Sequence, residues 1–283
     1  MENPYKAYPV RIDKIEVATE DKTLRTFTFV FLNEGDEEKF SYEAGQFAEL
    51  SIPGKGEIPI GIASSPTEKG FVRFTVFRTG LVTNHLHNMK VGDIMGVRGP
   101  LGNSYPLKDL EGKNIVIIGA GFAFTTLRST IVYLLDPANR SKFGTIDVIY
   151  GARNPGLVLY KDELAVWEQR DDINMHITVD NADDDPEWKY HVGFVPTITE
   201  TQAPQADADT YAIMCGPPMM LKFTKPVLDK LGYKHENIIM SLENRMKCGI
   251  GICGRCNIGK ELICKDGPVF TLAELKDMPE EDT

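Results

Sequence analysis

The sequence lacks several features that would place it in other classes of protein. No run of apolar residues approaches the ~20 that a membrane-spanning helix needs, and the first residues do not have the basic-then-apolar form of a secretory signal peptide. Cysteine is scarce, with five among 283 residues, so the chain is not a disulfide scaffold. We therefore expect a cytoplasmic protein with no membrane span.

Basic residues are also fewer than acidic residues. Lys and Arg number 31 against 41 Asp and Glu, which gives a formal net charge of -10. A nucleic-acid partner would require a basic face, so this balance argues against one. The sequence contains no internal repeats, and no Ser/His/Asp set lies in the context that a hydrolase would need. The five histidines are scattered and predict no metal site.

Four of the five cysteines gather in one motif near the C-terminus: Cys248, Cys253, Cys256 and Cys264. The spacing C-x4-C-x2-C with a later cysteine is typical of the plant-type ligand set of a [2Fe–2S] cluster. Glycines at 249, 251 and 254 would let the backbone wrap around such a cluster. Zinc sites more often use two separated C-x2-4-C pairs, so this spacing favours the cluster over zinc, and disulfides are less consistent still with a cytoplasmic chain.

Two patterns of secondary structure divide the chain. Short β-prone segments at residues 8–18, 24–32, 46–52, 71–78 and 93–98 predict a small antiparallel β-barrel. From residue 114 the pattern changes to strands at 114–119, 145–150, 174–179 and 210–214 that alternate with helices at 126–135, 160–169 and 219–231. That alternation predicts a doubly wound α/β domain. A strand at 237–241 would lead into the cysteine loop. We expect domains at 1–110, 111–236 and 237–283.

A barrel, an α/β domain and a [2Fe–2S] segment in this order resemble the layout of the ferredoxin–NADP reductase superfamily, whose barrel binds FAD. Phe77-Arg-Thr-Gly-Leu-Val-Thr83 is similar to the family's second flavin motif. Arg98-Gly-Pro-Leu-Gly102 resembles the turn that closes the flavin barrel and places Gly102 there. The resemblance implies that the FAD pyrophosphate is bound around Arg78, Gly80, Leu81, Val82 and Thr83.

The resemblance continues through the α/β domain. Cys215-Gly-Pro-Pro-Met219 resembles the family's nicotinamide-side motif, and Tyr150-Gly-Ala-Arg-Asn154 resembles the segment beside the NAD(P) ribose. The implied NAD(P) contacts are Gly119, Gly121, Arg153, Cys215, Gly216 and Pro217. The cofactors supply the hydride chemistry in this family, so no catalytic acid or base is expected, although Cys215 would lie near the nicotinamide or simply fill the end of a buried strand.

Two further strings resemble a narrower group. Ser241-Leu-Glu-Asn-Arg-Met-Lys-Cys248 and Cys264-Lys-Asp-Gly-Pro-Val-Phe270 are similar to the gamma (diaphorase) subunits of NAD(P)-linked hydrogenases, or sulfhydrogenases, and to the electron-transfer subunit of dihydroorotate dehydrogenase. This implies a hetero-oligomer that exchanges electrons between NAD(P)H and a hydrogenase-like, heterodisulfide-reductase-like or dihydroorotate-dehydrogenase-like partner.

The first flavin motif departs from the family pattern Arg-x-Tyr-Ser/Thr. The aligned stretch, Ile58-Pro-Ile-Gly-Ile-Ala-Ser-Ser65, has Ile58 for Arg, Ile60 for Tyr and Gly61 for the hydroxyl residue. Losing a side-chain hydrogen bond typically costs ~1 kcal/mol, so FAD binding is still expected. The resemblance assigns four contacts here: Ile60, Gly61, Ile62 and Ser64.

The glycine-rich turn after the first α/β strand also departs. The family expects Gly-Gly-Gly-Ile-Gly-x-Ala-Pro-Leu-Arg-Ser, and this chain has Gly119-Ala-Gly-Phe-Ala-Phe-Thr-Thr-Leu-Arg-Ser129. We expect the ring of Phe124 to narrow the nucleotide cleft and the hydroxyl of Thr126 to cap the helix in place of proline. A working NAD(P) site is favoured. The alternative is a non-enzymatic conduit or adaptor with a disabled site.

Overall fold

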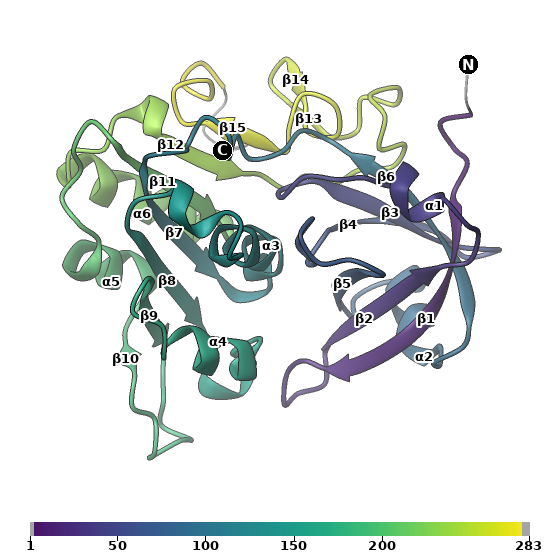
Figure 1. Ribbon diagram of the computed structural model, residues 1–283, viewed down its shortest axis with the longest axis horizontal. Helices are drawn as coiled ribbons and strands as arrows, with labels where there is room; N and C mark the ends of the chain where they lie inside the picture. The colour runs from purple at the N-terminus through teal and green to yellow at the C-terminus, as the bar shows by residue number, and fades with distance from the viewer. Residues whose placement is uncertain (1–2, 279–283) are drawn as a thin grey trace.

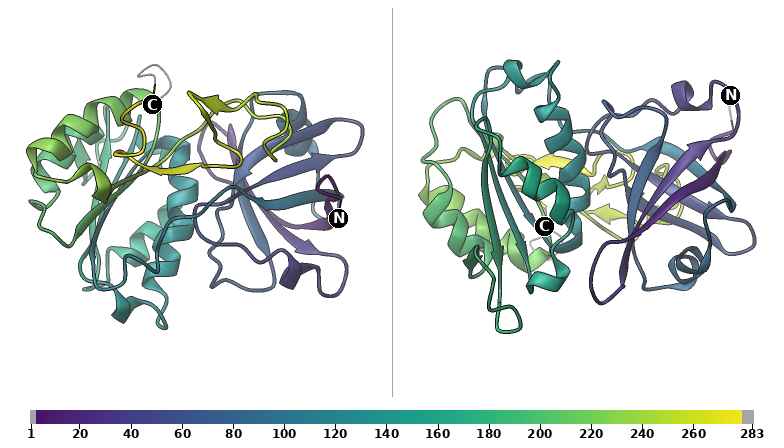
Figure 2. Two further views of the ribbon diagram at one scale, coloured as in Figure 1. Left: turned by 90° about the horizontal axis from the view of Figure 1, so that it is seen from above. Right: turned by 60° about the horizontal axis from the view of Figure 1, so that its bottom comes forward.

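The computed structural model describes residues 3–278 and shows two lobes joined by a C-terminal segment (Figure 1). The N-terminal lobe is a β-barrel and the other lobe is an α/β sandwich. The C-terminal segment, yellow-green in the figures, runs over the top of both lobes and contacts each (Figures 1 and 2). Among residues 3–278, no helix combines the length and hydropathy required to cross a bilayer.

The barrel is an antiparallel sheet in the order β4-β3-β6-β1-β2-β5. Alternation sets the orientation of its strands: in β1, Val10 and Ile12 are buried while Arg11 and Asp13 face solvent. Apolar side chains from all six strands and α2 form one core. The bounds are β1 Tyr8–Val17, β2 Leu24–Phe31, α1 Asp36–Lys39, β3 Phe47–Ile52, β4 Gly56–Gly61, β5 Val72–Phe77, α2 Leu81–Asn88 and β6 Ile94–Leu101.

The second sheet has the order β10-β9-β8-β7-β11-β12-β15. Its first strand, β7, is almost wholly apolar and buried, as a central parallel strand must be. The strand order reverses between β7 and β11, where Gly119 lies opposite Cys215. The bounds are β7 Asn114–Ala120, α3 Phe124–Leu135, β8 Ile146–Ala152, α4 Lys161–Trp167, β9 Asn174–Val179, β10 His191–Val192, α5 Val195–Gln202, β11 Thr210–Cys215 and α6 Pro218–Lys230.

Helices cover both faces of this sheet. The core that contains α3 and α4 lies on the barrel side, and the core that contains α5 and α6 lies on the opposite side (Figure 1). The sheet is therefore doubly wound, as the sequence predicts. In such sheets, ligands bind outside the carboxyl ends of the strands at the point where the order reverses. Here that point is the β7–β11 pair, and its end faces the barrel through α3.

The C-terminal segment contributes two strands to the sheet of the α/β lobe and forms a separate two-stranded sheet. β12 (Ile238–Ser241) continues the parallel sheet, and β15 (Val269–Thr271) pairs with it antiparallel at the edge. Between them, the cysteine loop and the small hairpin of β13 (Asn257–Ile258) and β14 (Glu261–Leu262) extend toward the barrel. The segment that carries the cysteines is thus anchored in the α/β lobe at both ends.

Candidate cofactor site between the lobes

A cavity of about 310 Å³ opens where the three parts of the chain meet. That size is within the range of small-molecule and cofactor sites. The barrel contributes residues of β3, β4, β5 and the α2 entry, including Ile58, Ile60 and Gly61. The other walls are formed by Phe122, Thr125, Thr126 and Cys215 of the α/β lobe, and by Ser241, Leu242, Glu243, Asn244, Met246 and Pro268 of the C-terminal segment.

The side chain of Thr126 explains why residue 61 is glycine. A Cβ added at Gly61 would overlap Cγ2 of Thr126, which projects from the first turn of α3 into the space where the side chain of residue 61 would stand. The two departures from the family pattern, a missing hydroxyl on β4 and a missing proline on α3, are therefore one paired change across the interface. The Thr126 hydroxyl remains at the cavity wall and donates to the carbonyl oxygen of Ala123 at 3.0 Å.

The glycine-rich turn corrects two expectations. Phe124 does not narrow the cleft, because its ring is fully buried and stacks on Tyr150 with centroids 3.8 Å apart. The aromatic residue at the cavity is Phe122, which is 44% exposed and stacks on Phe77 of the barrel at 6.2 Å. Thr126 does not cap α3, because it lies inside the helix and its hydroxyl donates to a carbonyl instead of accepting from an amide.

The predicted nicotinamide-side residues converge at the strand reversal. Gly119 has no room for a side chain, since an added Cβ would lie 2.6 Å from Leu127 Cδ1, and a Cβ on Gly216 would overlap Met220. Gly121 has φ +57°, which favours glycine. Cys215 is buried, and the Thr126 hydroxyl lies 3.6 Å from its sulfur. Burial raises the pKa of the Cys215 thiol to about 12, so it stays protonated. Pro217 caps α6 and is exposed.

The predicted pyrophosphate motif forms the start of α2. Gly80 is the residue before the helix, and the Thr83 hydroxyl accepts hydrogen bonds from the amides of Thr79 and Gly80 at 2.9 and 2.7 Å. Thr83 lines the cavity, Val82 is buried in the barrel core, and the side chains of Arg78 and Leu81 are exposed. The motif therefore presents a helix start at the cavity edge, where anionic groups bind favourably.

Of the predicted contacts, Ile60, Gly61, Thr83 and Cys215 line the cavity itself, whereas Ile62, Ser64, Gly102 and Arg153 do not. Ile62 is buried in the barrel core, and Ser64 is buried with its hydroxyl engaged by Tyr42 and by the amide of Arg73. Gly102 has φ +72° and packs against Gly267 and Pro268, where an added Cβ would lie 2.6 Å from Pro268 Cδ. Arg153 is exposed after β8. Their assignment as cofactor contacts stays a prediction.

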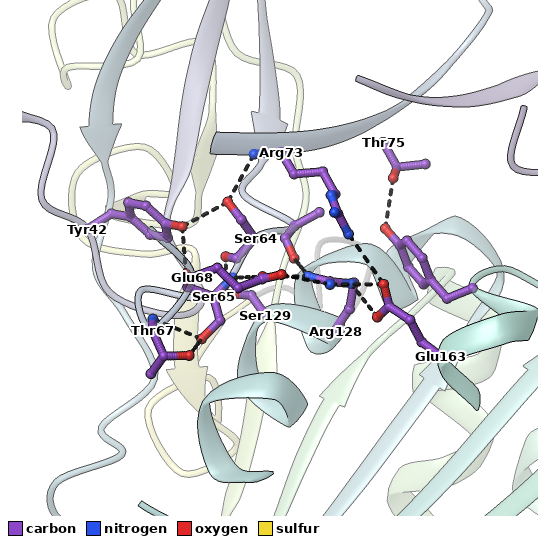
Figure 3. Close-up of polar contacts among 12 residues, drawn as sticks. Tyr42, Ser64, Ser65, Thr67, Glu68, Arg73, Thr75, Arg128, Ser129 and Glu163 are labelled. Carbon is purple, nitrogen blue, oxygen red and sulfur yellow. Dashed lines mark hydrogen bonds and ion pairs between the residues drawn. The ribbon is translucent and has the colours of Figure 1, made fainter. Parts of the chain in front are cut away.

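A buried polar network joins the two lobes beside the cavity (Figure 3). The guanidinium of Arg128 on α3, only 3% exposed, donates to both carboxylate oxygens of Glu68 and of Glu163 at 2.7–3.1 Å and to the carbonyl oxygen of Ala63 at 2.8 Å. The next residue, Ser129, donates to the carbonyl oxygen of Ser64 at 2.7 Å. Arg128 and Ser129 match the Leu-Arg-Ser end of the family's glycine-rich turn, but sequence reasoning gave them no role. The structure shows it fixing α3, and hence Phe122 and Thr126, against the barrel.

The four motif cysteines form two pairs: three lie in the glycine-rich loop, and Cys264 follows the β13–β14 hairpin. Cys248 is hydrogen-bonded to Cys253, and Cys264 to Cys256. Among residues 3–278, no three Cys, His, Asp or Glu side chains converge on a single metal position. A dinuclear cluster does not need that convergence, because two irons share four thiolates. The pairing is compatible with an iron–sulfur cluster.

Backbone amides point at the cysteine sulfurs, as a thiolate site requires. Gly251 N lies 3.1 Å from Cys264 Sγ, and Ile252 N lies 3.3 Å from Cys248 Sγ. Gly249, Gly251 and Gly254 all have positive φ, between +67° and +76°, which lets the loop turn its amides inward. Burial raises the pKa of the Cys248 thiol, but hydrogen bonds from the amides of Ile250, Cys253 and Ile252 and from the Cys253 side chain outweigh it and lower the pKa to about 6. The residues present fit an iron–sulfur cluster.

Models of three known domains match the chain in the same order as the lobes. The oxidoreductase FAD-binding domain matches residues 11–105, the oxidoreductase NAD-binding domain matches residues 117–226, and the iron–sulfur cluster binding domain of dihydroorotate dehydrogenase B matches residues 243–276. Sulfhydrogenase 1 subunit gamma of Pyrococcus furiosus is 40% identical over 283 residues, covering 98% of this chain and 95% of the relative. The chain belongs to the sulfhydrogenase gamma subunit family within the ferredoxin–NADP reductase superfamily.

Other similar proteins extend the family. Sulfhydrogenase 2 subunit gamma of Pyrococcus furiosus is 35% identical, covering 95% of this chain and 96% of its own. The probable dihydroorotate dehydrogenase B electron transfer subunit of Thermococcus kodakarensis is 33% identical, covering 82% and 86%. The solved NADH-dependent reduced ferredoxin-NADP oxidoreductase has the same fold, with a TM-score of 0.74 and 23% identity over 96% of this chain and 90% of that one.

This family membership confirms the main predictions. The chain is an NAD(P)H-dependent flavin and iron–sulfur oxidoreductase subunit that transfers electrons, with a barrel, an α/β domain and an iron–sulfur region. The alternative of a non-enzymatic adaptor with a disabled nucleotide site is not favoured. Sequence reasoning gave no role in shaping the site to Phe122 or Arg128.

Proposed function

We propose that this chain is the electron-transfer subunit of a cytoplasmic hetero-oligomer, with FAD in the cavity, NAD(P) at the β7–β11 reversal and a [2Fe–2S] cluster on Cys248, Cys253, Cys256 and Cys264. One observation carries the proposal. The cavity wall is shared by the barrel, the start of α3 and residues 241–246, which lead directly into the cysteine loop. A flavin there would lie between a nucleotide site and a cluster site.

The residues have distinct roles in this proposal. Ile58 and Ile60 present apolar surface to the isoalloxazine, and the α2 start holds the pyrophosphate. Phe122 and Phe77 close the cavity mouth against water, and Cys215, which stays protonated, leaves the nicotinamide position uncharged. The bound cofactors supply hydride transfer and the splitting of an electron pair into single electrons; the protein supplies positions and a dry environment.

The partner is proposed to be an oxidoreductase with its own substrate site. The relatives are named as subunits of sulfhydrogenase and of dihydroorotate dehydrogenase B, and a hydrogenase-like partner is favoured because the sulfhydrogenase gamma subunits are more similar in sequence and in coverage. The division at residues 110 and 236 is proposed as the boundary between FAD, NAD(P) and cluster regions.

Anaerobic titration of the FAD- and iron-loaded protein tests the proposal. NADH or NADPH should bleach the flavin absorption and then the visible absorption of the cluster, with two irons per chain. Comparing NADH with NADPH also identifies the preferred nucleotide. An iron-free or zinc-loaded preparation, or a flavin that neither nucleotide reduces, would contradict the proposal.

Replacing Cys253 by serine should remove the cluster and leave the flavin. Cys253 is the exposed member of its pair, so the substitution leaves the buried sulfurs and the lobes unchanged. We expect iron content to fall to near zero while FAD content and flavin reduction by NAD(P)H are retained. Cys215→Ser is the matched control, because Cys215 lies outside the motif, and it should keep its iron. Full iron in Cys253→Ser would show that the ligand set is different.

A further inference from the structure

A buried arginine of the barrel contacts the cluster loop directly. Arg98 in β6 is 2% exposed, and its Nη2 donates to the carbonyl oxygen of Cys248 at 3.1 Å. Cys248 is the first cysteine of the motif, and it follows the residues that line the cavity. This hydrogen bond spans 150 residues and ties the start of the loop to the barrel.

Two glutamates set the position of the guanidinium. Glu57 on β4 accepts from Arg98 Nη2 at 2.7 Å and from Nε at 3.3 Å. Glu49 lies opposite Arg98 in the β3–β6 register, is 1% exposed, and has Oε1 3.9 Å from Nη2. The ring of Tyr5 covers the guanidinium, with its centroid 5.5 Å from Cζ. The arginine therefore has little freedom to follow the loop if the loop moves.

The loop also contacts this group through its backbone. Gly249 has φ +67°, and a Cβ added there would lie 3.0 Å from Glu49 Oε1 and 3.0 Å from Leu101 Cδ1. Only glycine lets the backbone after Cys248 pass this close to the carboxylate. Gly249 and Arg98 together hold the first cysteine of the motif against β3 and β6.

Stability of the barrel alone does not account for this cluster of charges. Arg98 Nη1 and both Glu49 oxygens are buried without a hydrogen-bond partner among the described residues. Buried ion pairs are often no more stabilising than apolar residues of similar size, and leaving polar atoms unpaired makes this one costlier. An apolar pair could not donate a hydrogen bond to the Cys248 carbonyl oxygen, as Arg98 does.

We propose that Arg98 is a positioning residue that fixes the Cys248 edge of the cluster relative to the flavin cavity and so sets the distance for electron transfer between them. This inference rests on the proposed function. Electron tunnelling slows exponentially with distance, so a small displacement of the loop changes the rate without changing either cofactor. The far end of the segment has a separate anchor: the Asn103 side chain hydrogen-bonds to Asp266 and Val269 at 2.8–3.0 Å.

That second anchor makes the inference testable in folded protein. Arg98→Lys keeps the charge but offers one ammonium, which cannot serve Glu57 and the Cys248 carbonyl with the geometry of a guanidinium fork. Arg98→Met removes both contacts. Arg140→Lys is the matched control, because Arg140 also donates to backbone carbonyls, those of Asp172 and Phe143, far from the cavity in the α/β lobe.

The experiment follows electrons from flavin to cluster in the FAD- and iron-loaded protein. A flash-generated deazaflavin radical reduces the flavin, so no nicotinamide nucleotide is needed, and the appearance of the reduced-cluster spectrum gives the rate. We expect Arg98→Lys to slow this step by a few-fold and Arg98→Met to slow it further, because each variant allows the loop to move away from the cavity. The electron paramagnetic resonance line shape of the reduced cluster should change in both, and Arg140→Lys should match the wild type.

The outcomes separate a positioning role from a structural one. Full iron and FAD with an altered line shape and a slower rate support the inference, as does iron loss confined to Arg98→Met. Unchanged line shape and rate in both variants overturn it, as does iron loss in both with a normal signal from the iron that remains. An iron-free wild type would contradict the proposed function itself, which is a different result from an iron-loaded wild type that is indifferent to Arg98.

Discussion

Replacing Arg128 by methionine is expected to lower the free energy of unfolding by about 3 kcal/mol, because removing one member of a buried charge network leaves the others unpaired. The guanidinium makes five hydrogen bonds to two carboxylates and one carbonyl. Methionine keeps most of the apolar stem, so the loss reports the polar contacts. Chemical denaturation of the apo protein measures the change, and cofactor loading then shows whether the cavity survives.

A surface arginine gives the matched comparison. Arg170 pairs with Asp172 at 2.8 Å, but both side chains are about a third exposed. Arg170→Met should therefore cost less than ~1 kcal/mol, the usual value of a solvent-exposed pair. Equal losses in the two variants would show that the buried network at Arg128 contributes no more to the free energy of unfolding than an exposed ion pair.

The pH dependence gives a second check on the same residue. Burial raises the pKa of Glu68, but hydrogen bonds from Arg128 outweigh it and lower the pKa below its usual value. A carboxyl with a lowered pKa in the folded state stabilises the protein above its unfolded pKa of about 4.3, and that stability is lost as the pH falls through the lower folded value. The difference between wild type and Arg128→Met should therefore shrink on acidification below pH ~4.

Gly61→Ser is expected to disrupt the cavity, and Thr126→Ser should restore it. The serine Cβ would overlap Thr126 Cγ2, and threonine on a helix has few side-chain rotamers with which to move away. Overpacking of this kind typically costs ~1–3 kcal/mol. We expect Gly61→Ser to lose most of its FAD on gel filtration. Thr126→Ser removes only the clashing methyl and retains the hydroxyl at the cavity wall.

A double-mutant cycle isolates the contact between the two positions. The sum of the single-variant losses in stability should exceed the loss in Gly61→Ser/Thr126→Ser by ~1 kcal/mol or more, because the two residues touch. FAD content should follow the same order. Additive losses would mean that Gly61 is required for another reason, such as the close approach of the flavin itself.

The sequence predicted those strands and helices whose pattern of apolar and polar residues can be recognised within the element itself. The alternation at the start of β1 and the apolar run of β7 each indicated which residues of the strand are buried, and the predicted strands lie within a few residues of the observed ones. α5 escaped detection because Val195–Gln202 is rich in β-branched residues, which favour strands; its helix is stabilised by packing against α6. β4 contains a proline and two glycines and carries little strand signal.

The site was harder to predict because its geometry depends on contacts between the lobes. The cysteine spacing lies within one short segment, so it could be recognised without knowledge of the fold. Whether Phe122 or Phe124 faces the cleft depends on how the 3-10 turn at Gly121–Ala123 and the start of α3 lie against the barrel, which no local pattern specifies. The partners of Arg128 come from residues 60 and 35 positions away in sequence, and its role is visible only once the lobes are assembled.

The edge strand β15 has a consequence for biosynthesis. It is made from residues 269–271, after every cysteine of the motif, yet it covers β12 at the margin of the nucleotide-binding sheet. A nascent chain that has not yet left the ribosome therefore exposes an unpaired parallel edge, which other chains can join. The sheet is therefore complete only after all four cysteines have been synthesised, so both the cysteine loop and the closed sheet edge form late.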